Sequence, residues 1–285
     1  MRQVAKLRAT ATMIPKRLIQ TSKSANLSLL GRAVASNLRL LHPDFEYCFF
    51  DDAAVSSFLD AEFPQYRRVF DQFRLPIQRY DFFRYLAVYR LGGFYFDTDV
   101  LLAKCVTPLL DCPAVFSFEE LSLSHLLPER FGVDWEIGNY AFGAEAGHPF
   151  LKAIIDDCVR GQEDSAWAAE GLKGFPRVIR PKFEAFYTTG PGAISRTLAE
   201  RPEVQPTVTI LFPHNILERK LWHKFGDYGV HLMQGTWVVR AVFWRRRIAH
   251  FWERRRRRLV AKRSQLRGPT RPGPWVARYP VTTGL

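Results

Sequence analysis

The sequence has few cysteines and no long apolar run, and both absences exclude classes of protein. The four cysteines show none of the short paired spacings that zinc sites and redox motifs need, so we expect reduced thiols. No stretch approaches the roughly 18 apolar residues of a membrane span, and the basic N-terminus lacks the continuous apolar stretch of a signal peptide. We therefore expect a cytoplasmic protein that is neither exported nor integral to a bilayer.

Net charge is also missing from most of the chain. The formal charge is +13, yet residues 1–239 hold 27 Lys or Arg and 27 Asp or Glu and sum to zero. Residues 240–263 hold 11 Lys or Arg against one Glu, and the last 22 residues supply the remaining three positive charges. Because a duplex-binding protein normally carries its basic face on the folded domain, we do not expect nucleic acid to be the partner.

Composition and charge together predict one large domain with a tail. With 285 residues, 47% of them hydrophobic, the chain can bury one sizeable core. We expect the main domain over residues 1–239, a basic amphipathic helical tail over 240–267, and a disordered tail over 268–285, where proline and glycine are frequent.

The basic tail has the pattern of a helix that lies on a membrane surface. Between residues 240 and 263, bulky apolar residues recur at three- and four-residue spacing and are surrounded by arginines. Anionic lipid attracts such a segment, which predicts peripheral association with the inner face of a membrane. A solvated charge run and a contact with RNA are the alternatives.

The first hundred residues predict the start of a nucleotide-binding α/β sheet. A short strand over 17–20, a helix with leucine and valine at helical spacing over 27–41, and an aromatic strand over 45–50 form one β-α-β unit. A second helix over 77–91 ends at two glycines. A strand over 94–96 follows, whereas we expect residues 161–174 to form a surface loop.

Two acids at the end of that strand are suited to a cation. In extended backbone the side chains of Asp97 and Asp99 point the same way, and acids at the carboxyl end of a strand lie where α/β sheets bind ligands. Such a pair suits Mg²⁺ or Mn²⁺, which keep positions open for phosphate oxygens. Asp-x-Asp alone also occurs in solvated loops, so whether this pair binds a cation must be judged from the surrounding sequence.

That surrounding sequence resembles a known family. The runs from Asp81 to Tyr85 and from Leu91 to Val100 are similar to the DXD region of the glycosyltransferases of family 32, which includes mannosyltransferases and bacterial sugar transferases for capsule or lipopolysaccharide. Further along the chain, Gly138-Asn139 and Thr189-Gly190-Pro191 keep the order of the family. The resemblance implies a GT-A type fold, which is a Rossmann-like mixed sheet flanked by helices. It also implies a nucleotide-sugar donor, a divalent metal and retention of anomeric configuration.

The resemblance assigns roles around the cation. Asp97 and Asp99 would hold the metal and the donor diphosphate, and His231 would supply a third ligand from far along the chain. Trp237 would close over the leaving group, with core packing as the alternative.

Other residues are candidates for donor and acceptor contacts. Asp81 would contact the nucleoside, or only pair with Arg84 at i,i+3 spacing. Arg84 would reach the metal-side acids or the sugar, or merely orient Asp81. Gln20 and Tyr95 would line the donor pocket. The alternatives are a buried, hydrogen-bonded amide for Gln20 and core packing for Tyr95. Asn139 would face the sugar or acceptor, or form a turn.

The function predicted from the sequence is metal-dependent transfer of a sugar. The donor would be a UDP- or GDP-sugar and the acceptor a hydroxyl of a glycan or lipid-linked glycan, with Mn²⁺ or Mg²⁺ as cofactor. One rival is a metal-dependent phosphohydrolase that uses the same two aspartates and needs further His/Asp clusters for a second metal. The other is a non-catalytic nucleic-acid-binding protein that acts through the arginine-rich tail.

Overall fold

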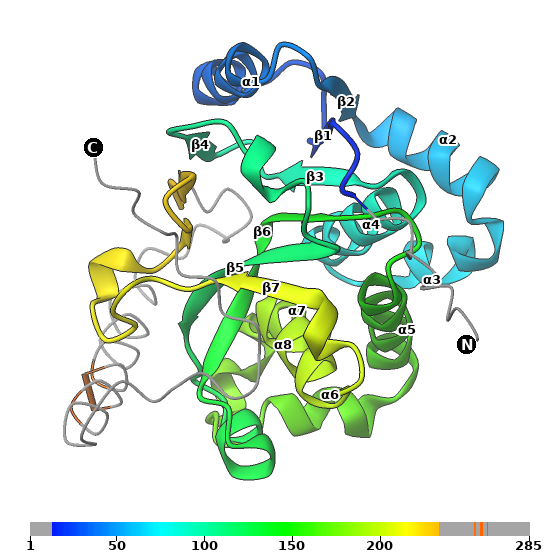
Figure 1. Ribbon diagram of the computed structural model, residues 1–285. Coiled ribbons are helices and arrows are strands. Elements are labelled where there is room, and N and C mark those ends of the chain that lie inside the picture. The colour runs from blue at the N-terminus through cyan, green and yellow to red at the C-terminus, as the bar shows by residue number, and fades with distance from the viewer. Residues whose placement is uncertain (1–12, 234–253, 255–256, 259–260, 262–285) are drawn as a thin grey trace, which may run out of the picture.

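One mixed sheet organises the part of the chain that the structure describes. This computed structural model describes residues 13–233, together with residues 254, 257–258 and 261. Over these residues nine strands form a single sheet in the order β2-β1-β3-β6-β5-β8-β9-β4, with β7 paired to β5 (Figure 1). The strands are β1 (Arg17–Thr21), β2 (Glu46–Phe50), β3 (Gly93–Phe96), β4 (Val100–Leu102), β5 (Ala114–Leu121), β6 (Trp135–Ala144), β7 (Val208–Leu211), β8 (Lys224–Phe225) and β9 (Gly229–His231).

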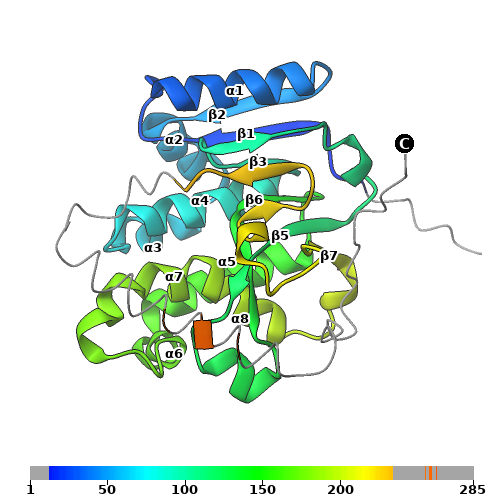
Figure 2. The ribbon, with the colours of Figure 1, turned by 90° about the vertical axis from the view of Figure 1, so that its left-hand side faces the viewer.

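Helices cover both faces of this sheet. Between residues 13 and 233 the α-helices are α1 (Leu29–Leu41), α2 (Asp52–Glu62), α3 (Arg67–Gln72), α4 (Pro76–Leu91), α5 (Pro149–Glu163), α6 (Ser165–Gly171), α7 (Glu184–Thr188) and α8 (Pro191–Ala199). Helix α1 lies on one side of the sheet, and α4 and α5 lie on the other (Figure 2). Short 3₁₀ turns occupy Pro64–Tyr66, Thr107–Leu109, Arg177–Lys182, Gln205–Thr207 and Arg219–Leu221, and a π turn occupies Leu127–Phe131.

The predicted β-α-β unit is present at the start of the chain. Strand β1 pairs in parallel with β2 on one side and with β3 on the other. Alternation along each strand divides the core, because successive side chains point to opposite faces. Leu18 and Phe94 belong to the cluster under α1, whereas Ile19 and Tyr95 belong to the cluster under α4 and α5.

Two glycines bring α4 back against the sheet. Gly92 (φ +64°) ends α4, and Gly93 (φ +111°) begins β3, so both have backbone angles that favour glycine. A Cβ on Gly93 would lie 2.7 Å from the carbonyl oxygen of Arg17 in β1. Any larger residue would therefore push β3 away from β1, and with it the acids that follow β3.

Strands β5 and β6 extend beyond the strand that carries those acids. Phe96, the last residue of β3, pairs with Ala141, so residues 135–140 of β6 continue past the carboxyl end of β3, by roughly 20 Å at the usual rise per residue. They pair there with residues 117–121 of β5 after register shifts. We call residues 117–121 and 135–140 the projecting hairpin.

The architecture confirms the predicted α/β fold, a mixed sheet flanked by helices. The surface loop expected over 161–174 is wrong, because Asp164 caps α6 by accepting from the backbone of Ala166 and Trp167, and Trp167 is buried. The predicted tails over 240–267 and 268–285 lie almost wholly outside the described residues.

Candidate active site

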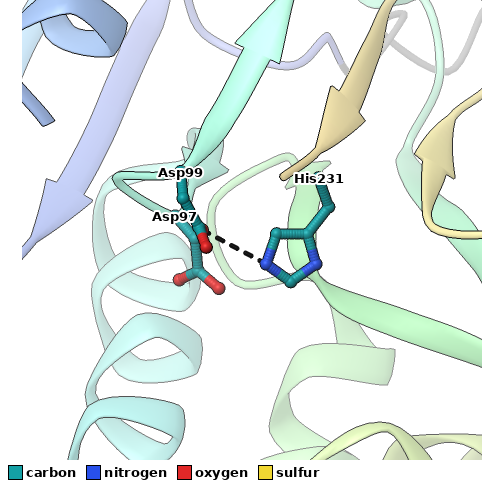
Figure 3. A group of neighbouring side chains, drawn as sticks. All are labelled: Asp97, Asp99 and His231. Carbon is teal, nitrogen blue, oxygen red and sulfur yellow. Dashed lines mark ion pairs between the residues drawn. The ribbon is translucent and has the colours of Figure 1, made fainter. Parts of the chain in front are cut away.

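Three predicted ligands come together at the carboxyl end of β3. Asp97 follows β3, Asp99 precedes β4, and His231 ends β9, where it pairs with Val100. One ligand atom from each of the three lies within 4.8 Å of the others, and their side chains are partly exposed. Figure 3 shows the carboxylates and the imidazole converging, with His231 Nε2 3.2 Å from Asp99 Oδ1.

The two acids meet across a turn and not along an extended strand. The backbone N–H of Val100 donates to the carbonyl oxygen of Asp97 at 3.0 Å, so the chain bends between β3 and β4. The prediction that the two side chains point together is confirmed, although the expected extended geometry is wrong. The bend matters because it leads the chain into β4, to which β9 and its histidine are paired.

Backbone contacts fix each of the three ligands. Asp97 N–H donates to the carbonyl of Tyr140 at 2.8 Å, and the carbonyl of Asp99 accepts from Leu232 N–H at 2.9 Å. The ring of His231 stacks on that of Tyr140 at 4.5 Å between centroids. Burial opposes protonation of His231, but the hydrogen bond to Asp99 and the charge of Asp97 raise its pKa above the ordinary value.

Arg84 and Tyr95 hold the carboxylate of Asp97. The hydroxyl of Tyr95 donates to Asp97 Oδ1 at 2.7 Å, and Arg84 Nη1 lies 3.2 Å from the same oxygen. Arg84 also lies over the Tyr95 ring, 4.7 Å from its centroid. Arg84 thus reaches one of the two metal-side acids, Asp97, and Tyr95 is both a core residue and a direct partner of Asp97.

A buried network surrounds Asp81, whose side chain is almost completely covered. Arg84 Nη2 lies 3.2 Å from Asp81 Oδ1, the Asn139 amide donates to the same oxygen at 2.9 Å, and the Thr189 hydroxyl donates to Oδ2 at 2.9 Å. Burial raises the pKa of Asp81, although Arg84 and the hydrogen-bond donors favour its charged form. The ion pair with Arg84 is therefore present, and the contact to a nucleoside stays a prediction.

Asn139 and Gln20 link strands beside the acids. The Asn139 amide also donates to the Tyr85 hydroxyl at 2.8 Å, so its nitrogen is used within the protein. Gln20 is buried, accepts from the Tyr47 hydroxyl at 2.8 Å and lies 3.3 Å from the carbonyl of Asp97. The satisfied-amide interpretation of Gln20 is confirmed, and its donor contact stays a prediction.

Sequence reasoning missed three residues next to the metal ligands. Tyr140 stacks on His231, and Glu119 on β5 accepts from or pairs with His223 Nδ1 at 3.2 Å. The carbonyl of His223 in turn accepts from His231 N–H at 3.0 Å. For Glu119 the available signal was the presence of three polar residues, Ser117, Glu119 and Glu120, inside an otherwise apolar strand. Trp237 lies outside the described residues.

Comparison with known proteins finds a family model that matches the part of the chain around the two acids. Residues 32–115 match the family model described as "Glycosyltransferase sugar-binding region containing DXD motif". Over these residues the chain is similar to this family. The matched part includes Asp81, Arg84 and both metal-side acids, while His231 and the projecting hairpin lie beyond it. The DXD motif of the family therefore corresponds to Asp97 and Asp99, and the structure places His231 beside them.

The curated relatives that match this chain include several mannosyltransferases. It is 32% identical over 218 residues to "Inositol phosphoceramide mannosyltransferase 2" of Schizosaccharomyces pombe, covering 75% of this chain and 55% of the relative. It is 29% identical over 147 residues to "Inositol phosphoceramide mannosyltransferase 3" of the same organism, covering 52% and 38%. It is 27% identical over 198 residues to that organism's "Initiation-specific alpha-1,6-mannosyltransferase", covering 63% and 46%. The chain thus spans about a third to a half of the length of these relatives.

Two of the solved structures that align with this chain are titled as glycosyltransferases. The "PaToxG Glycosyltransferase" aligns with a TM-score of 0.48 at 14% identity, over 67% of this chain and 70% of that one. The UDP-bound glycosyltransferase domain from the YGT toxin aligns with a TM-score of 0.42 at 9% identity, over 70% and 80%.

Proposed function

We propose that this chain is a glycosyltransferase that moves a hexose, most simply mannose, from a nucleotide-sugar donor to an acceptor hydroxyl. The carrying observation is the convergence of Asp97, Asp99 and His231 at the carboxyl end of β3 in a chain that is similar to the DXD family. Mannose is the sugar in the names of three relatives that match the chain. The donor would be a GDP- or UDP-sugar.

The residues present fit a divalent cation. Two carboxylates and one imidazole within 4.8 Å of one another form a donor set that suits Mn²⁺ or Mg²⁺. When bound there, the cation supplies positive charge to the diphosphate that leaves with the nucleoside. In the part of the chain that the structure describes, no second group of three such side chains is found, and the phosphohydrolase rival needs one.

The side chains around Asp97 act by fixing the geometry of the site. Tyr95 and Arg84 direct the Asp97 carboxylate, and Asp81 and the Asn139 carbonyl in turn hold Arg84. A ligand oriented in this way loses little freedom on binding the cation. Burial of Arg84 also keeps a fixed positive charge beside the place where negative charge develops on the donor.

The acceptor and the cellular setting belong to the same proposal. Two relatives are named for inositol phosphoceramide, so we propose a lipid-borne polyol hydroxyl as acceptor for this chain. A basic segment at residues 240–263 would hold the enzyme at an anionic membrane surface on the cytoplasmic side. Among the described helices, none has the length and apolar character needed to span a bilayer. Retention of anomeric configuration is the stereochemistry that we propose.

A donor screen tests this function. Purified chain is incubated with GDP-mannose, UDP-glucose and related nucleotide sugars with Mn²⁺, and release of nucleoside diphosphate is measured for wild type, Asp99→Asn and the exposed control Asp111→Asn. We expect cleavage that EDTA abolishes, a loss of about 10²- to 10³-fold in Asp99→Asn and no change in the control. Equal activity of wild type and Asp99→Asn would refute the proposal. Proton NMR of the newly formed glycoside reports its anomeric configuration.

A further inference from the structure

Buried polar atoms without partners gather on the projecting hairpin. In the described part of the chain, seven buried side-chain nitrogen or oxygen atoms have no hydrogen-bond partner. Three of them lie on the hairpin and one belongs to the metal-side imidazole: Ser117 Oγ, Glu119 Oε2, Glu136 Oε2 and His231 Nδ1. Because unpaired buried polar groups are costly and rare in folded proteins, such a concentration at one place indicates a ligand.

Each of the two glutamates has one oxygen in use and one free. Glu119 is 6% exposed, with Oε1 3.2 Å from His223 Nδ1 and Oε2 without a partner. Glu136 is completely buried; its Oε1 accepts from Ser122 at 2.7 Å and from Tyr187 at 3.2 Å, and its Oε2 is free. Fixing one oxygen orients the other, which is how a carboxyl group is prepared for a ligand hydroxyl.

The position of the hairpin points to the acceptor and not to the nucleotide. Strand β3 lies between β1 on one side and the β6–β5 pair on the other. If the nucleotide lies over β1, where the sequence predicts donor contacts, a sugar bound beside β3 would have its acceptor toward β6 and β5. Glu119 Oε1 lies 3.2 Å from His223 Nδ1, and the His223 carbonyl accepts from His231 N–H at 3.0 Å, so Glu119 lies beside the three candidate metal ligands. Glu136 lies four residues before Tyr140, roughly 13 Å along the strand. That span accommodates one or two sugar rings.

The chemistry of the free atoms favours a neutral polyol. A hydroxyl donates one hydrogen bond and accepts others, so it matches both carboxyl oxygens and the imidazole nitrogen. Burial raises the pKa of Glu136 to about 8, with the nearby charges of Glu120 and Glu119 acting in the same direction, so near neutral pH its carboxyl group carries a proton and can also donate. A phosphorylated ring is disfavoured, because its charge would face the Glu119 carboxylate.

We propose that the projecting hairpin is the acceptor subsite, in which Glu119 and Glu136 bind hydroxyls of a neutral polyhydroxylated ring. This inference rests on the proposed function. The ring can come from a sugar of a glycan or from an inositol headgroup, since both present the same row of hydroxyls. Glu119 and Glu136 are binding residues here, and no proton transfer by them is part of the proposal.

Saturation-transfer NMR on the full chain with Mn²⁺ and GDP tests the subsite directly. The probes are methyl α-mannoside, myo-inositol and, as the charged arm, mannose 6-phosphate. We expect a neutral ring to bind and mannose 6-phosphate not to bind, with preference between the two neutral probes separating a glycan from an inositol source. In Glu119→Gln the Kd of the bound ring should rise about tenfold, because one charged hydrogen-bond acceptor is lost.

A matched control and a second variant keep the result interpretable. Glu129→Gln, whose side chain is 71% exposed between β5 and β6, should bind as wild type does. Should Glu119→Gln fail to fold, Ser117→Ala replaces it, with the same expected direction. Binding of no neutral probe by wild type, or unchanged affinity in the hairpin variants, would overturn the subsite.

The ratio of transfer to hydrolysis separates this inference from the proposed function. With GDP-mannose and the bound probe as acceptor, we expect this ratio to fall about tenfold in Glu119→Gln, since acceptor binding weakens more than donor cleavage. Wild type that binds the ring but cleaves no donor refutes the proposed function and leaves the subsite standing. Wild type that cleaves the donor while Glu119→Gln keeps the same ratio refutes the subsite alone.

Discussion

The polar side chains on the two sides of β3 differ in how fully they are hydrogen-bonded within the protein. On the β1 side and under α4, Gln20 and Asp81 have both polar ends of their side chains bonded within the protein, and Arg84 is shared between two acids. On the projecting hairpin, Glu119 and Glu136 each keep an oxygen unpaired. We call the first the complete side, because its hydrogen bonds hold Asp97, a candidate metal ligand, within the protein. The second would be completed by the proposed acceptor.

The largest expected loss of stability comes from removing Arg84 from the network around Asp81, on the complete side. Arg84→Met leaves Asp81 buried without its cation, so we expect the free energy of unfolding to fall by about 3–5 kcal/mol, measured by urea denaturation. Arg67→Met is the matched control, because Arg67 pairs with Asp60 and Asp71 at the surface, where such a pair contributes about 0–1 kcal/mol. Similar losses in both variants would show that the network around Asp81 is no more complete than a surface cluster.

The second prediction concerns the projecting hairpin and the pH dependence of stability that Glu136 contributes. Burial raises the pKa of Glu136 to about 8, above its ordinary value of 4.5, so between these values the folded chain holds a proton that the unfolded chain releases. Stability should therefore be greatest below about pH 4.5 with respect to this group and fall by up to about 1.4 kcal/mol per pH unit as pH rises to 8. In Glu136→Gln that slope should be absent. Urea denaturation at several pH values measures it, and identical slopes in both proteins contradict the prediction.

The complete side is also the side that the sequence predicts well. The β-α-β unit, α4 and β3 depend on local periodicity and on Gly92-Gly93, which are visible in the sequence. Asp97 and Asp99 follow directly from the end of β3. The partners of Asp81 could be predicted only in part, because Asn139 and Thr189 lie 58 and 108 residues away along the chain.

The projecting hairpin could not be predicted because its role depends on pairing at long range. Glu119 and Glu136 lie in strands where alternation alone predicts polar side chains facing solvent, whereas the structure buries both. The resemblance to the family supplied His231, but only the β4–β9 pairing shows why residue 231 reaches residue 99. For Tyr140, nothing in the sequence indicated a place in the site except its position next to Asn139.

The third prediction concerns how tightly the hairpin holds its free atoms. A Cβ on Gly138 would lie 2.6 Å from both Glu119 Oε2 and Ser117 Oγ, so Gly138→Ala must displace them. We expect a loss of about 1–3 kcal/mol in unfolding free energy, with a parallel loss of polyol binding. Gly31→Ala in α1, whose new methyl group meets only the side chains of Leu27 at 3.2 Å and Ser28 at 3.5 Å, is the control and should be neutral or slightly stabilising. Unchanged stability in Gly138→Ala would mean that the hairpin is loosely packed there.

The smallest expected effect tests whether the complete side orients the metal ligands. Tyr95→Phe removes the hydroxyl that donates to Asp97 Oδ1 at 2.7 Å, but Arg84 remains at 3.2 Å from the same oxygen. Because one of two orienting contacts is kept, we expect the Kd for Mn²⁺ to rise by about tenfold, at the low end for loss of such a partner. Isothermal titration with Mn²⁺ measures the Kd, and Tyr47→Phe, which loses a hydroxyl bonded to Gln20 and not to a ligand, is the control. An equal rise in both variants would assign the effect to general loosening of the sheet, whereas a rise confined to Tyr95→Phe shows that the carboxylate must be held in place for the cation to bind.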